Sequence, residues 1–349
     1  MITKADMVRR LLDGRKVSIR PESVAFAPAN IALCKYWGKR DIELNLPVTD
    51  SLSIALGSLG SRCRLAVTAG GVDCITLNGE PLAPAHPFAA RLSGYLDLFR
   101  GAEARHFRVD AVNTVPTAAG FASSASGFAS VVRALDALHG WNLPDRDLSI
   151  LARLGSGSAC RSLWQGFVRW HAGVDTDGMD SYAEPLPGQW PSLRMGLLMV
   201  SDKPKAIGST EAMRRTVETS SLYAAWPRQV ATDMETILQA LRDLDFDTLG
   251  SAAESNALAM HATMLAARPP VLYWHEDTLA AMRIVWACRR DGLPVYFTMD
   301  AGPNLKLLYR ETDADAVAAA FATGMQDAGH HPGFAGRFHP VDLSIHLPV

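Results

Sequence analysis

The sequence predicts an α+β fold of two lobes, the first rich in β-strands and the second rich in helices. The chain has 349 residues, of which 48% are hydrophobic and 20% charged, so it can bury a sizeable core in two lobes. Short apolar runs broken by polar loops dominate its first part, a pattern typical of strands. Long stretches with apolar residues at helical spacing dominate its second part.

Residues 1–23 are predicted to form an extension before the first lobe. They carry charges throughout and no continuous apolar core, so they fit neither a signal peptide nor a membrane span. We expect a short amphipathic segment that is either helical and packed on the body or disordered.

The first lobe is predicted over residues 24–190. Strands are expected within 24–56, 62–77, 107–112 and 163–171, with a Gly-Gly turn inside the second of these segments. After the loop PTAAGFASSAS, apolar residues at helical spacing predict a helix, namely Phe128, Val131, Val132, Leu135 and Leu138. A short apolar run at 148–154 and the small-residue turn GSGSACRS precede the last strand.

The second lobe is predicted over residues 191–349. It is expected to open with a strand at 195–200 and to continue with helices at 229–241, 248–265 and 277–290, the last ending near Gly292. A strand at 294–299, the turn DAGPN, a strand at 305–309 and a helix at 313–327 follow.

Charge and cysteine content exclude several classes of function. The 34 basic and 36 acidic side chains are interspersed and give a formal net charge of −2, so we expect neither nucleic acid nor a membrane as partner. The five cysteines are odd in number and lack C-x-x-C spacing, which argues against disulfides and structural zinc and favours the cytoplasm. No histidine spacing typical of a metal site is present.

The loop before the helix at Phe128 has the composition of a phosphate site. Its small residues, among them Gly120 and Ala122, allow backbone N–H groups and the helix dipole to converge on phosphate oxygens. The hydroxyls of Ser123 and Ser124 add donors or a metal contact. The alternative is a tight turn at a close-packed helix start. No Lys follows the glycine, so the loop differs from that of the doubly wound nucleotide-binding folds.

Two further segments offer cations for an anionic ligand. In APANIALCKYWGKRD, the cations Lys35, Lys39 and Arg40 lie beside two aromatic residues, although a solvated loop would look the same; Asn30 there could be a loop residue or a cap. In GSGSACRS, Arg161 follows small flexible residues and suits a bidentate grip on carboxylate or phosphate, while a surface salt bridge or a helix cap is the alternative.

Two other positions carry hydroxyl or carboxylate chemistry. Asp300 ends an apolar strand before a glycine turn, where it could accept or orient a hydroxyl proton or simply serve as a turn residue. Ser209, in IGSTEAM, could bind a ligand, but its position favours a helix cap.

Taken together and in this order, these segments resemble the diphosphomevalonate decarboxylases of the GHMP kinase superfamily. The resemblance spans about residues 24–310, and KYWGKRD and GSGSACRS are its most specific parts. Phe121, Ser126 and Met299 depart from the residues usual in the family. The resemblance implies a two-lobed fold with the active site in the cleft, a homodimer, and ATP and Mg²⁺ as cofactors.

The resemblance also assigns roles to residues. It implies Asp300, Arg161 and Lys39 as catalytic. It places the substrate, mevalonate 5-diphosphate, among Tyr36, Lys39, Ser156, Ser158, Arg161, Ser209, Met213, Asp300 and Ala301. It places ATP at Asn30, Gly120, Ala122, Ser123 and Ser124, with Ser124 also near the metal. Three alternatives stay open: a decarboxylase of mevalonate 5-phosphate or 3,5-bisphosphate, a mevalonate 3-kinase, and a non-catalytic nucleotide- or metabolite-binding relative.

Overall fold

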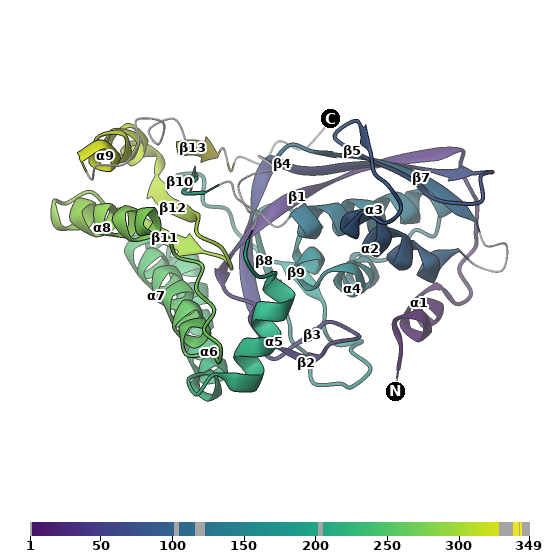
Figure 1. Ribbon diagram of the computed structural model, residues 1–349, viewed down its shortest axis with the longest axis horizontal. Helices are drawn as coiled ribbons and strands as arrows, with labels where there is room; N and C mark the ends of the chain where they lie inside the picture. Colours follow the sequence, from purple (N-terminus) through teal and green to yellow (C-terminus); the bar gives the residue numbers. More distant parts are fainter. Residues whose placement is uncertain are drawn as a thin grey trace.

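The computed structural model describes residues 2–100, 105–115, 123–201, 205–327, 338–341 and 343. They form two lobes side by side, each a sheet with helices packed against it (Figure 1). This confirms the predicted two-lobed α+β fold.

The first lobe is built on a seven-stranded sheet in the order β6-β5-β7-β4-β8-β9, with β1 also paired to β4. Its strands are β1 (Glu22–Cys34), β4 (Ser51–Thr68), β5 (Cys74–Leu77), β6 (Glu80–Pro81), β7 (His106–Asn113), β8 (Phe167–Trp170) and β9 (Ala183–Pro185). A small hairpin of β2 (Lys39–Asp41) and β3 (Leu46–Pro47) extends from it.

The long pairing of β1 with β4 depends on a glycine. The register shifts between Pro28 and Asn30, where Gly60 lies opposite Pro28. A Cβ atom on Gly60 would lie 2.2 Å from the carbonyl oxygen of Ala27. Only a residue without a side chain therefore allows the two strands to approach here.

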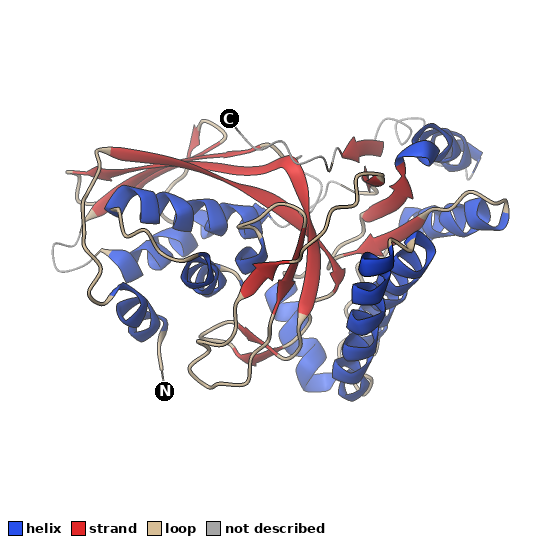
Figure 2. Cartoon of the chain, turned by 180° about the vertical axis from the view of Figure 1, so that it is seen from behind, coloured by secondary structure: helices blue, strands red, loops and turns tan. Residues whose placement is uncertain are grey.

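Helices cover one face of this sheet, as both views show (Figures 1 and 2). They are α1 (Lys4–Leu12), α2 (Pro87–Leu96), η1 (Asp97–Phe99), α3 (Ser123–His139), α4 (Asp145–Gly155) and η3 (Gly157–Arg161). In α1, Thr3 and Asp6 form a capping box, and Met7, Val8 and Leu11 are buried in the core of the lobe. The N-terminal extension is thus helical and packed on the body.

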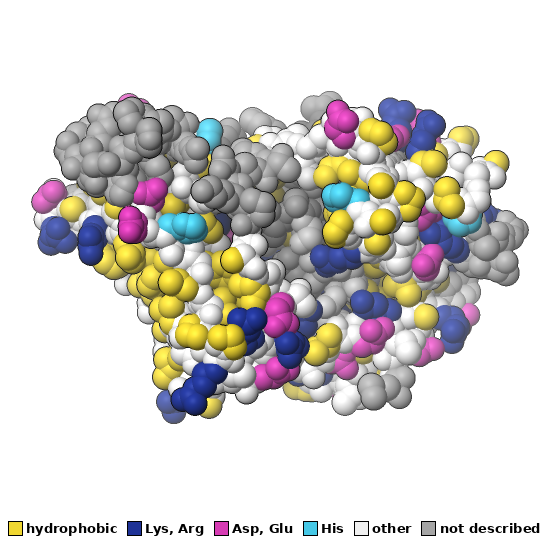
Figure 3. All heavy atoms as spheres, in the orientation of Figure 1, with side chains coloured by type: hydrophobic (Ala, Val, Ile, Leu, Met, Phe, Trp, Pro, Cys, Tyr) yellow, Lys and Arg dark blue, Asp and Glu magenta, His cyan; other side chains and the backbone are white. Residues whose placement is uncertain are grey.

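The second lobe has a four-stranded sheet in the order β11-β12-β10-β13. Its strands are β10 (Leu193–Leu198), β11 (Tyr296–Met299), β12 (Leu305–Arg310) and β13 (Phe338–Val341). Its helices are α5 (Ser209–Thr219), η4 (Tyr223–Ala225), α6 (Trp226–Asp243), α7 (Phe246–Leu265), α8 (Glu276–Arg290), η5 (Glu311–Asp313) and α9 (Ala314–Asp327). Hydrophobic side chains gather over the helices of this lobe in Figure 3, and charged side chains of both signs are scattered over both lobes on that face.

The two lobes share a hydrophobic core at the end of β1. Ile31 and Leu33 pack in the same cluster as Met234 and Ile237 of α6. The side-chain oxygen of Asn256, on α7, also accepts a 2.7 Å hydrogen bond from the backbone N–H of Lys35. The residues after β1 are therefore fixed from both sides. We propose that the boundary between the first lobe and the second lobe lies at residues 190/191, between β9 and β10.

Most predicted elements are present, with three differences. The apolar run at 148–154 lies inside helix α4, and the strand expected over 163–171 is limited to β8. Helix α2 and the strands β6, β9 and β13 were not predicted. All five cysteines are free. Among the described residues, no helix has the length and apolar content needed to cross a membrane.

Candidate active site

A polar pocket lies between the lobes and collects most of the residues that the sequence singles out. It is lined from β1 and the loop after it, the hairpin, α2, α3, η3, α5, α7 and the turn after β11. The lining residues are Ala32, Lys35, Tyr36, Trp37, Lys39, Asn45, Arg91, Ser124, Ser156, Gly157, Ser158, Arg161, Ser209, Thr210, Met213, Met260, Asp300 and Ala301.

Asp300 lies at the end of β11 with its carboxylate between two buried lysines. Lys35 Nζ is 3.0 Å from Oδ1, and Lys306 Nζ is 3.2 Å from Oδ2. Burial alone would raise the pKa of this carboxyl, but the ammonium groups of Lys306 and Lys35 outweigh it and hold the pKa far below its ordinary value. Asp300 is therefore an anion at neutral pH.

The backbone and the first lysine at Asp300 are also held in place. Burial lowers the pKa of His261 to about 3, so its ring is neutral and Nε2–H donates to the Asp300 carbonyl oxygen over 3.1 Å. Lys35 donates to the carbonyl oxygen of Ala32 over 2.7 Å. Burial lowers the pKa of Lys35 to about 8 although Asp300 opposes the shift. The group around Asp300 is thus preorganised before any ligand binds.

Arg161 ends η3, is buried, and has neutral hydroxyls as its hydrogen-bond partners. Its Nε donates to Ser53 Oγ over 3.1 Å and its Nη1 to Ser51 Oγ over 2.5 Å. The guanidinium also lies over the ring of Trp170, 5.7 Å from the centroid. Among the described residues no carboxylate lies within ion-pair distance of it. A desolvated cation of this kind suits an anionic ligand in the pocket.

The predicted cation cluster of Lys35, Lys39 and Arg40 is split by the fold. Lys35 turns to Asp300, and Lys39 lines the pocket and donates to Asn45 Oδ1 over 2.6 Å. Arg40 instead donates to the carbonyl oxygens of Ala172 and Asp175 on the outside. The interpretation of Arg40 as part of an anion site is not supported by this geometry, because strand β2 directs neighbouring side chains to opposite faces.

Hydroxyl groups complete the pocket wall. The hydroxyl oxygen of Tyr36 is buried and has no hydrogen-bond partner among the described residues, so it is available to a ligand. Ser156 and Ser158 line the pocket from η3 and the residue before it. Ser124, at the start of α3, is half-buried with its Oγ 3.4 Å from Ser156 Oγ.

Of the remaining residues predicted to contact ATP, only some are among the described residues. Gly120 and Ala122 lie outside the described residues, and of Ser123 only the backbone is described. Asn30 lies behind the pocket wall, where its Nδ2 donates to Ser162 Oγ over 2.7 Å and to the Ser158 carbonyl oxygen over 3.3 Å. Asn30 therefore supports the η3 segment from behind.

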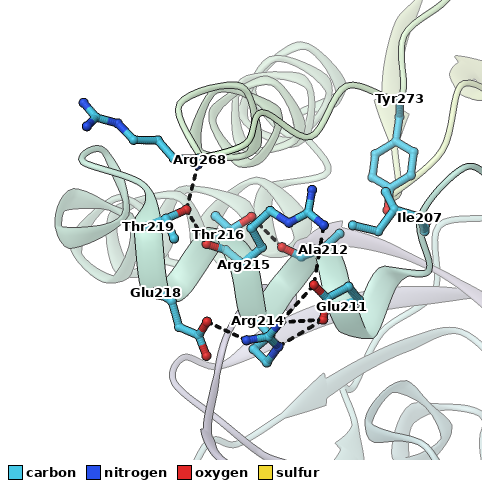
Figure 4. Close-up of polar contacts among 10 residues, drawn as sticks. All are labelled: Ile207, Glu211, Ala212, Arg214, Arg215, Thr216, Glu218, Thr219, Arg268 and Tyr273. Atoms are coloured by element: carbon cyan, nitrogen blue, oxygen red, sulfur yellow. Dashed lines mark hydrogen bonds and ion pairs between the residues drawn. The ribbon is translucent and has the colours of Figure 1, made fainter.

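Helix α5 lines the pocket from the second lobe with Ser209, Thr210 and Met213, and Figure 4 shows polar contacts along this helix. Its N-cap is Gly208 and not Ser209, so the expected cap is wrong by one residue and the Ser209 hydroxyl remains in the pocket. Tyr273 Oη donates to the Ile207 carbonyl oxygen over 3.0 Å, and Arg268 N donates to Thr219 Oγ1 over 2.7 Å. These bonds fix both ends of the helix, and Met213 packs its buried side against the pocket.

The loop KYWGK depends on a glycine at its centre. Gly38 has φ +118, and a Cβ atom there would lie 1.7 Å from Tyr223 Oη, which donates to the Trp37 carbonyl oxygen over 3.1 Å. We expect Gly38→Ala to lower the free energy of unfolding by roughly 2–4 kcal/mol through strain and collision. Urea denaturation measures the loss.

The control for this prediction is Gly14→Ala. Gly14 also has positive φ, +69, but open space around it, so only the conformational cost of about 1–2 kcal/mol is expected. Adding Tyr223→Phe to Gly38→Ala is expected to recover part of the loss. Equal losses in the two glycine variants would contradict the collision with Tyr223.

Comparisons with known proteins match most of the chain to one family. The family model of the diphosphomevalonate decarboxylase-like N-terminal domain matches residues 27–183, and that of the mevalonate 5-diphosphate decarboxylase C-terminal domain matches residues 196–338. The chain is 38% identical to a diphosphomevalonate decarboxylase of Aspergillus fumigatus, over 93% of this chain and 85% of the relative.

Solved structures are similar over nearly the whole chain. The structure of MDDEF in complex with MVAPP, AMPPCP and magnesium has a TM-score of 0.83 and 38% identity, covering 91% of this chain and 95% of that one. The mevalonate diphosphate decarboxylase of Staphylococcus aureus has a TM-score of 0.85 and 33% identity, with 93% and 96% covered.

Proposed function

The chain belongs to the diphosphomevalonate decarboxylase family, and we propose that it converts (R)-5-diphosphomevalonate to isopentenyl diphosphate with release of ADP, phosphate and CO₂. The enzyme is an ATP-dependent decarboxylase of the mevalonate pathway of isoprenoid biosynthesis. The observation that carries this proposal is the convergence of an anionic Asp300, a buried Arg161 and Lys39 on one pocket. A tertiary hydroxyl, a carboxylate and a diphosphate require such a set of groups.

The residues present fit ATP and Mg²⁺, its cofactors. Helix α3 runs from Ser123 to His139, long enough for its N-terminal N–H groups and dipole to attract phosphate, and the Ser124 hydroxyl lies at that end. Arg91 adds a cation to the same pocket and donates to the Gly155 carbonyl oxygen over 2.8 Å. The described residues contain no cluster of three or more metal-binding side chains, which suits a metal held mainly by the phosphates.

Each substrate group has a proposed contact in this chain. Arg161 holds the carboxylate bidentately, and Asp300 accepts the hydrogen bond of the tertiary hydroxyl. Lys39, with the hydroxyls of Tyr36 and Ser209, binds the diphosphate. Ser156, Ser158, Met213 and Ala301 shape the rest of the substrate site.

The reaction follows from these contacts. When bound, ATP supplies the phosphoryl group that makes the tertiary hydroxyl a leaving group, and Mg²⁺ offsets the charge of its phosphates. As the bond to the tertiary carbon breaks, the carboxylate of Asp300 stabilises the positive charge that develops there. Arg161 keeps the substrate carboxylate aligned, so that the electrons released with CO₂ form the double bond.

The proposal is tested by assaying the purified protein with Mg-ATP and mevalonate 5-diphosphate. We expect CO₂, phosphate and isopentenyl diphosphate in equal amounts. Faster turnover of mevalonate 5-phosphate or the 3,5-bisphosphate would assign another decarboxylase. ADP without CO₂ would indicate a mevalonate 3-kinase, and absence of turnover would indicate a non-catalytic nucleotide- or metabolite-binding relative.

Assembly and location form part of the proposal. We infer a cytoplasmic homodimer; the free thiols of all five cysteines support a reducing compartment. Size-exclusion chromatography with light scattering tests the dimer, and fractionation of the source cells tests the location.

Binding of the substrate is expected to depend on pH through Lys39. Burial, and then the charges of Lys4 and Arg91, lower the pKa of Lys39 to about 8, so the ammonium is lost as the pH rises through that value. Since the protonated form binds the diphosphate, the dissociation constant of mevalonate 5-diphosphate should rise about tenfold between pH 7 and pH 9. Titration calorimetry measures it.

Lys39→Arg is the control, because a guanidinium remains charged throughout this range. We expect its dissociation constant to change much less between the same two pH values. Parallel curves for the two proteins would assign the pH dependence to another group, with Lys35 the first candidate.

A further inference from the structure

Lys306 occupies a strand position at which packing favours an apolar residue. On β12, Leu305 and Leu307 pack with the helices of the second lobe, and Leu308 packs in the core shared by the lobes. Lys306 is on the same face as Leu308 and only 2% exposed. Its neighbours across the sheet are Thr298 and Leu197. The sheet alone therefore gives no reason for a charge here.

A buried ammonium is costly unless it is paired. Lys306 Nζ lies 3.2 Å from Asp300 Oδ2 and 3.4 Å from the Asn304 carbonyl oxygen. The ion pair with Asp300 thus compensates the burial of this charge. Because Asp300 lines the pocket, the ion pair of Lys306 stabilises a charged group of the site and not the packing of the sheet.

The two lysines hold Asp300 from different lobes. Lys35, at the loop after β1, contacts Oδ1, while Lys306, from β12, contacts Oδ2. Each oxygen therefore has its own cation, and this arrangement fixes the plane of the carboxylate. Loss of one cation would leave the carboxylate free to rotate about its Cβ–Cγ bond.

We propose that Lys306 is a positioning residue, which fixes the orientation of the Asp300 carboxylate for the tertiary hydroxyl and keeps it anionic in the pocket. This inference rests on the proposed function, since it assigns a part in that reaction. Lys306 acts through Asp300 and needs no contact with the substrate.

The charges around Asp300 set the direction of the expected effects. Lys35, Lys306 and Lys205 surround it, with Arg161 nearby and the neutral His261 on its carbonyl oxygen. Lys306 contributes strongly to the low pKa of Asp300, and its charge helps to lower the pKa of Lys35 to about 8. Without Lys306, the pKa values of both Asp300 and Lys35 move upward.

The test is Lys306→Met, which keeps an unbranched side chain one heavy atom shorter and removes the charge. We expect kcat to fall by roughly 30- to 100-fold, the size of a lost positioning contact. Dissociation constants for mevalonate 5-diphosphate and ATP should stay within about threefold, because neither ligand needs Lys306 for contact. The high-pH limb of the kcat profile should move to higher pH, because the pKa of Lys35 rises. Lys306→Arg should recover part of the rate. A kcat within threefold of the wild type would overturn the proposal.

Leu308→Met is the matched control, two positions along the same strand and on the same face. It changes the packing without changing a charge, so kcat should remain near the wild-type value. If Leu308→Met lost as much turnover as Lys306→Met, a packing effect would explain both and the proposal would fall.

A second measurement separates this inference from the proposed function. With ¹³C-labelled aspartate, the carboxyl carbon of Asp300, assigned by its loss in Asp300→Asn, should titrate at higher pH in Lys306→Met than in the wild type. That result would support the positioning role of Lys306 even if the wild-type protein released no CO₂. Absence of CO₂ release would contradict only the proposed reaction. If Asp300 titrated at the same pH in Lys306→Met as in the wild type, the positioning role of Lys306 would be overturned whatever the activity.

Discussion

Replacing Asp300 by asparagine is expected to lower kcat by about 10³-fold or more, while the dissociation constant of ATP should change by less than threefold. The substitution keeps the shape of the side chain and removes its charge. An amide oxygen still accepts a hydrogen bond but is hardly basic, so the site loses the group that can take the proton of the tertiary hydroxyl. It also loses the anion that stabilises the developing positive charge, and each of these effects is worth about 10²-fold or more. Single-turnover measurements of phosphate and CO₂ release, with calorimetry for ATP, check it.

The same substitution should also reduce stability in a pH-dependent way. Lys35 and Lys306 would face each other without a carboxylate, and the pKa of Lys35, which Asp300 raises, would fall below about 8. At pH 7 this buried repulsion lowers the free energy of unfolding, and the loss becomes smaller as Lys35 deprotonates at higher pH. If the loss in free energy of unfolding grew with pH, the placement of Asp300 between Lys35 and Lys306 would be contradicted.

Glu254→Gln is the matched control for Asp300→Asn. Glu254 is a buried acid of the second lobe that does not line the pocket; it is ion-paired to Arg289 Nη1 over 2.7 Å and also accepts from the backbone N–H of Phe297. We expect this variant to lose stability while kcat is retained. If both variants lost turnover equally, the effect of Asp300→Asn would be structural.

The sequence predicted elements best where periodicity was long and local. Helices α6, α7 and α8 were expected from apolar spacing alone, and the DAGPN turn from its glycine and proline. The run at 148–154 was ambiguous, because a short apolar run fits a buried strand or a buried helix, and every residue from Leu148 to Gly155 of α4 is buried. Strands β9 and β13 are short, and tertiary pairing decides where they form.

The site was predictable where motifs carry chemistry and unpredictable where contacts are distant. Asp300, Arg161 and Lys39 stand in distinctive segments, and the fold brings them to one pocket. Lys306 in LKLLYR resembles a solvent-facing strand residue in sequence. Only the fold shows that it is buried and that it contacts Asp300. His261 lies on a mostly buried helix and gave no local signal either.

Two buried arginines show how function differs from support in this fold. Arg153, on α4, donates to the backbone carbonyl oxygens of Leu44 and Gly178 over 3.2 Å and 2.8 Å, and to that of Ser181. Arg161 donates only to serine hydroxyls among the described residues. Burial lowers the pKa of both side chains. The first is satisfied by the fold, whereas the second remains suited to an anion.

Replacing Arg161 by glutamine is therefore expected to lower kcat/KM for mevalonate 5-diphosphate by about 10²- to 10⁴-fold, with both kcat and KM affected. Two charge-assisted hydrogen bonds to the carboxylate, at about 1.5–3 kcal/mol each, are lost. The free energy of unfolding should not fall, since the variant removes a buried charge without an ionic partner. Arg153→Gln should do the reverse, with lower stability and a KM near that of the wild type. Steady-state kinetics and urea denaturation of both variants check this, and a normal KM in Arg161→Gln would remove the assigned grip on the carboxylate.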